Sequence, residues 1–234
     1  MPVFTLGAEL RFPGPEQAES DGLLAAGGDL SVPRLLSAYG SGIFPWYGAR
    51  SPILWWCPPQ RSLIFPGEEH LSRSTRRALS KLPFETRRDT SFEAVITQCA
   101  RVARQGQPGT WITPAMRRAY LALHQEGYAH SFETFRDGQL VGGLYGVSLG
   151  AAFFGESMFS LEPYASRAAF AELCRAAWGW GFAFIDGQVP NDNLAGLGAR
   201  TLPREAFLER LRVALAAPTR RGTWDAGPLP GGCP

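Results

Sequence analysis

Three polar side chains stand at the ends of apolar stretches. Glu156 is a lone carboxylate near the end of residues 151–160, and Asp186 and Gln188 follow the apolar run 182–185. Because Asp186 and Gln188 are two residues apart, an extended chain would point both side chains the same way. A carboxylate among apolar residues is costly unless it is paired, so the pattern predicts a cationic partner for Glu156. The alternatives are a solvent-exposed carboxylate at Glu156 and a simple strand-end cap at the other two positions.

The elements that must position these groups follow from periodicity and turn residues. The stretch 142–160 predicts two strands joined by a turn at 148–150, and its five glycines indicate bulges or the close approach of another backbone or a ligand. An Asp137-Gly138 pair predicts a tight hairpin before it. The order after residue 60 is helices, three consecutive strands, a helix, a strand and a helix. This order predicts an α+β fold with a mostly antiparallel sheet flanked by helices.

The chain divides by composition. Residues 1–60 are rich in Gly, Pro and Trp and poor in Lys and Arg, which predicts a small N-terminal domain. Residues 61–217 form the expected larger, catalytic domain. The Pro- and Gly-rich residues 218–234 are expected to be a disordered tail.

Composition also limits the function. The 234 residues carry a net charge of only +2, so any contact with nucleic acid must come from local clusters of basic residues. The four cysteines and three histidines show no metal-ligand spacing, which predicts no metal and no disulfide framework. The absence of a signal peptide or an apolar run of transmembrane length predicts a cytoplasmic protein that contacts no membrane.

One helix is divided by charge. Residues 71–82 predict a helix with an apolar face and a basic face, and the four basic residues are Arg73, Arg76, Arg77 and Lys81. A charged face is most often simply solvated, but a face of one sign suits a phosphate backbone. The aromatics of the first 60 residues form either the core of a small unit or a stacking surface for a base.

The motifs together resemble a known family. They are Phe12-Pro13, residues 21–31, 42–47 and 52–56, His70 to Ser74, Gly109 to Ile112, 142–160, and Ile185 to Gln188 with Leu197-Gly198-Ala199. In this order they are similar to the leucyl/phenylalanyl-tRNA–protein transferases. The resemblance implies a small N-terminal domain followed by an acetyltransferase-like (GNAT) domain. It implies transfer of Leu or Phe, with Met as a further candidate, from aminoacyl-tRNA to proteins beginning with Arg or Lys, which marks them for degradation. It also implies that no cofactor is used.

The resemblance assigns roles residue by residue. It makes Asp186, Gln188 and Glu156 the catalytic groups. It places Trp46 and Trp111 near the 3′-terminal adenosine of the tRNA and the four basic residues of 71–82 near the acceptor stem. The expected pocket for the amino-acid side chain consists of Leu144, Phe153, Gly155, Met158, Phe170 and Ile185. Without the resemblance, these six residues would be interpreted as ordinary residues of the hydrophobic core.

Some positions depart from the family pattern, and two other functions stay open. Tyr164 stands in an Asn position, Asn193 in a His position and Gly187 in place of a bulkier residue, and residues 57–60 differ from the family's consensus. One alternative function is a GNAT-fold N-acyltransferase that uses an acyl-CoA. No glycine-rich pyrophosphate loop opens a helix here, which argues against it. The other is an RNA-binding module without chemistry, against which the three polar groups argue.

Overall fold

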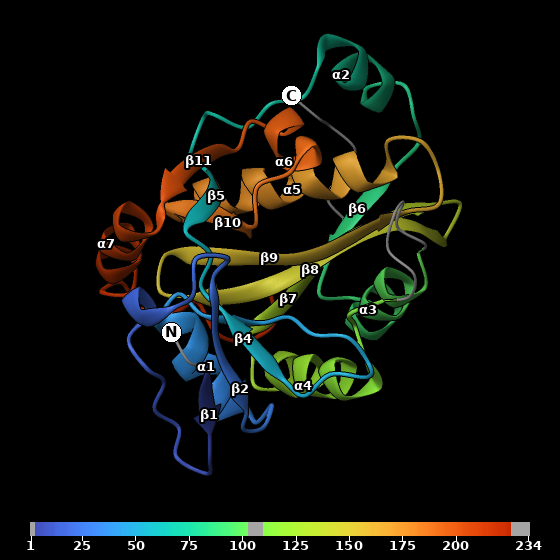
Figure 1. The fold of residues 1–234 in the computed structure, drawn as a ribbon. Helices are drawn as coiled ribbons and strands as arrows, with labels where there is room; N and C mark the ends of the chain where they lie inside the picture. Colours follow the sequence, from blue (N-terminus) through green and yellow to red (C-terminus); the bar gives the residue numbers. More distant parts are fainter. Residues whose placement is uncertain (1–2, 103–109, 226–234) are drawn as a thin grey trace.

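The computed structural model of the chain describes residues 3–102 and 110–225. Figure 1 shows two sheets, a small one at the N-terminus and a large one that crosses the molecule. The small sheet has the order β1-β2-β4-β3, and its strands are β1 (Phe4–Leu6), β2 (Leu23–Gly27), β3 (Phe44–Pro45) and β4 (Leu54–Trp56). The short helices of this part are the 3-10 turn η1 (Pro15–Gln17) and α1 (Val32–Gly40).

The large sheet has the order β11-β5-β10-β9-β8-β7-β6. Its strands are β5 (Gln60–Ile64), β6 (Glu85–Arg88), β7 (Ala129–Arg136), β8 (Gln139–Leu149), β9 (Ala152–Ser160), β10 (Phe184–Gln188) and β11 (Arg200–Pro203). The β9–β10 pair is parallel, and the other neighbouring pairs are antiparallel. The predicted α+β fold with a mostly antiparallel sheet is therefore confirmed. The hairpin at Asp137-Gly138 is confirmed too, with both residues at positive φ.

Helices cover both faces of the large sheet (Figure 1). On one face α5 (Ala165–Gly179) packs on β7, β8 and β9, and on the other α3 (Phe92–Arg101), α4 (Pro114–Gln125) and α1 pack. The remaining helices are α2 (Arg73–Leu79), α6 (Asp192–Gly196) and α7 (Arg204–Ala214). Helix α4 begins at Pro114 because Thr113 Oγ1 accepts a hydrogen bond from Met116 N and caps the first turn.

The two sheets share one apolar core. Trp55 of β4 and Tyr39 of α1 belong to the same buried cluster as Tyr120 of α4 and Phe154 of β9. A second cluster lies between the large sheet and α5. The N-terminal segment is therefore packed directly on the large sheet, and α1 reaches the face of β9 on which Glu156 lies.

The expected disorder of residues 218–234 is wrong for the described part of that segment. Trp224 is only 4% exposed, its ring stacks on His130 at 3.5 Å between centroids, and its backbone N–H donates to Asp89 Oδ2 at 2.8 Å. Trp224, through its contacts with His130 and Asp89, therefore holds the described part of this Pro- and Gly-rich segment on the fold. Residues 226–234 of the predicted tail lie outside the described residues.

Candidate active site

Glu156 is the extra residue of a β-bulge. In the β8–β9 ladder Tyr145 pairs with Ser157 and Gly146 pairs with Gly155, so Glu156 has no partner across the strand. A bulge bends a strand and redirects a side chain, which is why bulges are common at active sites. Gly146 is required opposite the bulge, because a Cβ there would lie 2.2 Å from the carbonyl oxygen of Phe154. The predicted meaning of the glycines in 142–160 is confirmed at this position.

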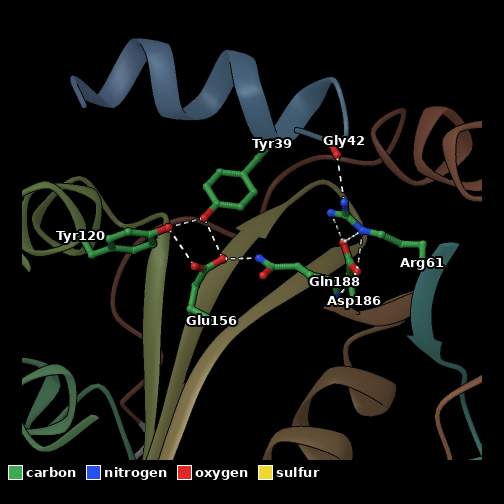
Figure 2. Close-up of polar contacts among 7 residues, drawn as sticks. All are labelled: Tyr39, Gly42, Arg61, Tyr120, Glu156, Asp186 and Gln188. Carbon is green, nitrogen blue, oxygen red and sulfur yellow. Dashed lines mark hydrogen bonds and ion pairs between the residues drawn. The ribbon is translucent and has the colours of Figure 1, made fainter. Parts of the chain in front are cut away.

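The Glu156 carboxyl group is held by neutral donors (Figure 2). Tyr39 Oη donates to Oε1 at 2.7 Å, Tyr120 Oη donates to Oε2 at 2.8 Å, and Gln188 Nε2 donates to Oε1 at 2.7 Å. All three partners are uncharged. None of them is the cationic partner that the sequence predicted for Glu156. The three donors come from α1, α4 and β10.

Burial and hydrogen bonding act in opposite directions on this carboxyl group. The pKa of Glu156 is raised to about 7. Burial is the largest cause and the negative charge of Asp186 adds to it, while the hydrogen bonds from Tyr39, Tyr120 and Gln188 act to lower the pKa. Burial and the nearby Glu156 charge raise the pKa of both tyrosines well above its ordinary value. Near neutral pH, Glu156 can therefore both bind and release a proton, while the tyrosines keep theirs.

Asp186 is fully buried and paired with Arg61 of β5. Arg61 Nε lies 2.9 Å from both carboxylate oxygens, and Nη2 lies 2.6 Å from Oδ2. Arg61 Nη1 also donates to Gly42 O at 3.1 Å, beyond the end of α1. The guanidinium lies over the rings of Phe44 and Phe207, 4.9 and 4.3 Å from their centroids. This pair joins β5, β10 and the N-terminal segment.

A second bulge separates Asp186 from Gln188. In the β10–β5 ladder Asp186 pairs with Leu63 and Gln188 pairs with Ser62, so Gly187 is left out. Gln188 has a φ of 64°, which is uncommon for a residue other than Gly. Asp186 Oδ1 supports this conformation by accepting a hydrogen bond from Gln188 N at 2.7 Å. The two side chains therefore reach different partners, Arg61 and Glu156, and do not form the simple same-side pair that their spacing predicts (Figure 2).

The six residues expected to line the amino-acid pocket gather around β9 and β10. Leu144, Phe153, Phe170 and Ile185 are buried in the cluster between the large sheet and α5, and Met158 is partly buried against it. A Cβ on Gly155 would lie 3.6 Å from Asp186 O, so Gly155 lies beside β10 where the parallel pairing ends. Five of the six therefore lie on the α5 side of the large sheet, whereas Tyr39 and Tyr120, which contact Glu156, belong to the other buried cluster.

The two tryptophans expected near the adenosine lie on neighbouring segments. Trp46 is exposed and makes an edge-on contact with Trp56 at 5.9 Å. Trp111 is partly buried just before α4. Tyr47 Oη lies 3.4 Å from Thr113 Oγ1, so the segment after Trp46 contacts the segment after Trp111.

The basic helix is shorter than expected but exposes the predicted residues. Arg73, Arg76, Arg77 and Lys81 all have exposed side chains, on α2 or just after it. Ser72 caps the start of the helix, because its Oγ accepts a hydrogen bond from Thr75 N. Two other basic residues of the segment 71–88 are engaged elsewhere. Arg87 pairs with Glu85 at 2.7 Å, and the buried Arg88 lies 3.5 Å from Glu172.

The structure shows the local surroundings of three departures from the family pattern. Tyr164 precedes α5 with a φ of 69°, a conformation that Asn tolerates better than Tyr. Asn193 Oδ1 accepts a hydrogen bond from Arg167 Nη2 at 2.8 Å. A Cβ on Gly187 would lie 2.7 Å from the Leu194 side chain, so Leu194 occupies the space of a larger residue.

Tyr39, Tyr120 and Arg61 belong to the site but were not predicted from the sequence. Tyr39 and Tyr120 fit the apolar faces of amphipathic helices, so their hydroxyl groups gave no separate signal. Arg61 did give one, because it is a single cation in the short strand before Phe65. A buried arginine almost always needs a carboxylate partner, which would have pointed to Asp186.

Two observations concern the predictions that the chain binds no metal and contacts no membrane. In the segments that the structure describes, no group of three or more His, Cys, Asp or Glu side chains could hold a metal ion. Within the same segments, no helix has both the length and the apolar character needed to cross a bilayer.

Comparison with known proteins gives a consistent result. A family model described as leucyl/phenylalanyl-tRNA protein transferase matches residues 63–212, and a model for the N-terminal domain of the same family matches residues 28–59. A leucyl/phenylalanyl-tRNA–protein transferase of Myxococcus xanthus (strain DK1622) is 51% identical over 229 residues, which are 97% of this chain and 98% of the relative. One of Syntrophus aciditrophicus (strain SB) is 53% identical over 228 residues, 97% of this chain and 95% of the relative.

A functionally unknown conserved protein from Staphylococcus epidermidis ATCC 12228 has a similar solved structure. Its TM-score is 0.40 at 10% identity, with 77% of this chain and 68% of that chain covered, which is too distant to support any functional statement.

Proposed function

The chain belongs to the leucyl/phenylalanyl-tRNA protein transferase family and is an aminoacyltransferase that acts on proteins, and we propose that it transfers Leu or Phe to N-terminal Arg or Lys. The donor is the aminoacyl-tRNA ester, with Met as a further candidate amino acid. The acceptor is the α-amino group of the protein, and the product is a new peptide bond that marks the protein for degradation. Membership of this family argues against the acyl-CoA alternative and against a module without chemistry.

The observation that carries the proposal is the Glu156 carboxyl group in its bulge. Its pKa of about 7 is close to that of a free α-amino group, about 7.7–8.0. Efficient proton transfer needs a base whose pKa is near the working pH. An acceptor amine must lose its proton before it can attack, and in this proposal the partly exposed Glu156 takes that proton.

The rest of the chemistry makes modest demands. An aminoacyl ester is already activated, so attack by an amine to form an amide needs no ATP. The site must hold the amine against the ester carbonyl, accept a proton and support the tetrahedral oxyanion. In this proposal Gln188 fixes the Glu156 carboxyl group through its 2.7 Å hydrogen bond and orients the amine.

Asp186 acts through its neighbours in this scheme. Its carboxylate is engaged by Arg61 and by the backbone of Gln188. We therefore assign it the positioning of Gln188 and of the N-terminal segment, and we assign proton acceptance to Glu156. This modifies the role that the family resemblance implies for Asp186.

The remaining predicted residues are proposed to bind the donor. The apolar groups around β9 and β10 would enclose the Leu or Phe side chain, Trp46 and Trp111 would stack on the terminal adenosine, and the basic residues of α2 and Lys81 would contact acceptor-stem phosphates. Exposed, same-sign charge on α2 supports the last assignment.

The proposed architecture is an N-terminal domain of residues 1–60 followed by an acetyltransferase-like (GNAT) domain of residues 61–217. A parallel strand pair inside an otherwise antiparallel, helix-covered sheet supports the second assignment. The separate four-stranded sheet supports the first.

The test is transfer between defined partners. Purified protein is incubated with leucyl-tRNA or phenylalanyl-tRNA and with peptides that differ only at the first residue. We expect transfer to peptides beginning with Arg or Lys and not to those beginning with Asp or Glu. An Nα-acetylated Arg peptide is the matched control and should receive nothing. Equal transfer to all first residues, or activity with leucyl-CoA in place of tRNA, would overturn the proposal.

A further inference from the structure

Three oxygen–oxygen contacts link Tyr39, Tyr120 and the Glu156 carboxyl group. Tyr39 Oη and Tyr120 Oη lie 2.5 Å from each other, and each also contacts one oxygen of the Glu156 carboxyl group, at 2.7 and 2.8 Å. The contacts close a ring through two phenols and one carboxyl group, drawn in Figure 2. Gln188 Nε2 adds a fourth contact from outside the ring, at Oε1.

The number of protons in this ring depends on Glu156. Each oxygen–oxygen contact needs one proton to be a hydrogen bond, and each phenol supplies one. With Glu156 ionised, two protons serve three contacts, so one contact brings two lone pairs together without a proton between them. With Glu156 protonated, each member of the ring donates once and accepts once, and all three contacts become hydrogen bonds.

The surroundings do not replace the missing proton. Tyr39 and Tyr120 are fully buried, so Glu156 is the member of the ring with exposed surface. Among the described residues, the titratable side chains next to the ring are Tyr145 of β8, edge-on to Tyr120 at 5.6 Å, and Asp186 of β10, which Arg61 of β5 neutralises. Burial, the main cause of the raised pKa of Glu156, favours the same protonated form.

We propose that in the free enzyme Glu156 carries a proton that closes a ring with Tyr39 and Tyr120, and that the ring releases this proton to solvent when the cationic amine of the acceptor binds. Tyr39 and Tyr120 are then positioning residues that act on the acceptor only through Glu156. This inference rests on the proposed function, because it assumes that the acceptor amine meets Glu156.

Every proton transferred in the proposed reaction can be accounted for. Binding of the ammonium group expels one proton from Glu156 to solvent, and the ammonium then gives one proton to the carboxylate and becomes a neutral amine. The amine nitrogen bonds to the ester carbon, and the adduct passes its second proton to the 3′-oxygen as the C–O bond breaks. The products are the amide and a free 3′-hydroxyl, and Glu156 is again protonated.

Stopped-flow mixing distinguishes proton release on acceptor binding from proton release that accompanies amide formation. Enzyme preloaded with phenylalanyl-tRNA is mixed with an Arg-initiated peptide in weak buffer containing a pH indicator, and amide formation is followed in parallel by quenched flow. We expect a release of about 0.9 proton per site at pH 6 before amide formation, and about 0.1 at pH 8, from a group with a pKa of about 7. Proton release that only tracks amide formation would overturn the inference.

Three variants make the test specific. Glu156→Gln should lose the early proton. Tyr39→Phe opens the ring, so the early release at pH 6 should fall, whereas a tyrosine that only donates to the carboxylate would raise the pKa of Glu156 on removal and extend the release to higher pH. Tyr145→Phe removes a neighbouring buried phenol outside the ring and should leave the early release unchanged.

The outcomes distinguish this inference from the proposed function. An amide formed without an early proton, or an early release that persists to higher pH in Tyr39→Phe, refutes the ring and leaves the aminoacyltransferase assignment intact. No amide with any Arg- or Lys-initiated peptide refutes the proposed acceptor itself, and with it the inference that depends on it.

Discussion

Removing the charge of Arg61 tests how the site is held together. In Arg61→Met the Asp186 carboxylate stays buried without its partner. Arg61 and Asp186 are 1% and 0% exposed, so solvent does not screen the pair, and the value for a buried pair applies rather than that for a surface pair. Breaking a buried pair costs about 3–5 kcal/mol. For a chain of this size each kcal/mol lowers Tm by about 2–4 °C, so we expect a loss of about 6–20 °C.

The assay is thermal unfolding of matched variants. Arg210→Met is the control, because Arg210 is exposed and also lies over an aromatic ring, that of Phe65, and its loss should cost less than about 0.5 kcal/mol. Arg61→Met combined with Asp186→Leu removes both charges and should lose less stability than Arg61→Met. The reasoning is refuted if Arg61→Met costs no more than the control, or if the double variant is as unstable as the single one.

Three further predictions concern catalysis and binding. Because peptide binding must expel the proton of Glu156, kcat/KM for an Arg-initiated peptide should rise with pH through about 7 as Glu156 ionises in the enzyme without peptide, and Glu156→Gln should remove this rise from the pH profile of kcat/KM. Arg73→Glu with Arg77→Glu should raise KM for aminoacyl-tRNA and flatten its salt dependence by about one unit per lost phosphate contact, while phenylalanyl-adenosine is used as before; equal damage to the minimal donor would contradict a phosphate-binding role. Gly146→Ala should lower the free energy of unfolding by about 1–3 kcal/mol, measured by chemical denaturation, because the added Cβ would lie 2.2 Å from Phe154 O. A variant as stable as wild type would show that the bulge can relax.

Local sequence patterns predicted the elements well. The Asp137-Gly138 pair needs no distant contact to favour a tight turn, and Thr113-Pro114 begins α4 through atoms within three residues. The order of elements after residue 60 predicted a sheet flanked by helices, and helices cover both faces of the large sheet. Family motifs spread over the chain pointed to Glu156, Asp186 and Gln188, and the structure brings these three together.

Patterns of composition failed where one long-range contact decides the outcome. Pro- and Gly-rich residues predicted a disordered segment from residue 218, but Trp224 enters a slot beside His130 and Asp89 that belongs to other elements. The two bulges were hidden for a similar reason. A spacing of two predicts side chains on the same side only if the ladder is regular, and the omission of Gly187 from the β10–β5 pairing depends on the neighbouring strand.

The sequence by itself determined the fold class and the local turns, because these depend on residue type or on contacts a few positions apart, and its family motifs pointed to Glu156, Asp186 and Gln188 as candidates for the chemistry. Only the tertiary structure decided the chemical state of those groups. The pKa of Glu156 depends on burial and on hydroxyl groups from Tyr39 and Tyr120, which are 117 and 36 residues away along the chain. The pairing of Asp186 depends on Arg61, 125 residues away, since proton affinity and charge neutralisation are set by distances in space and not by neighbours in sequence.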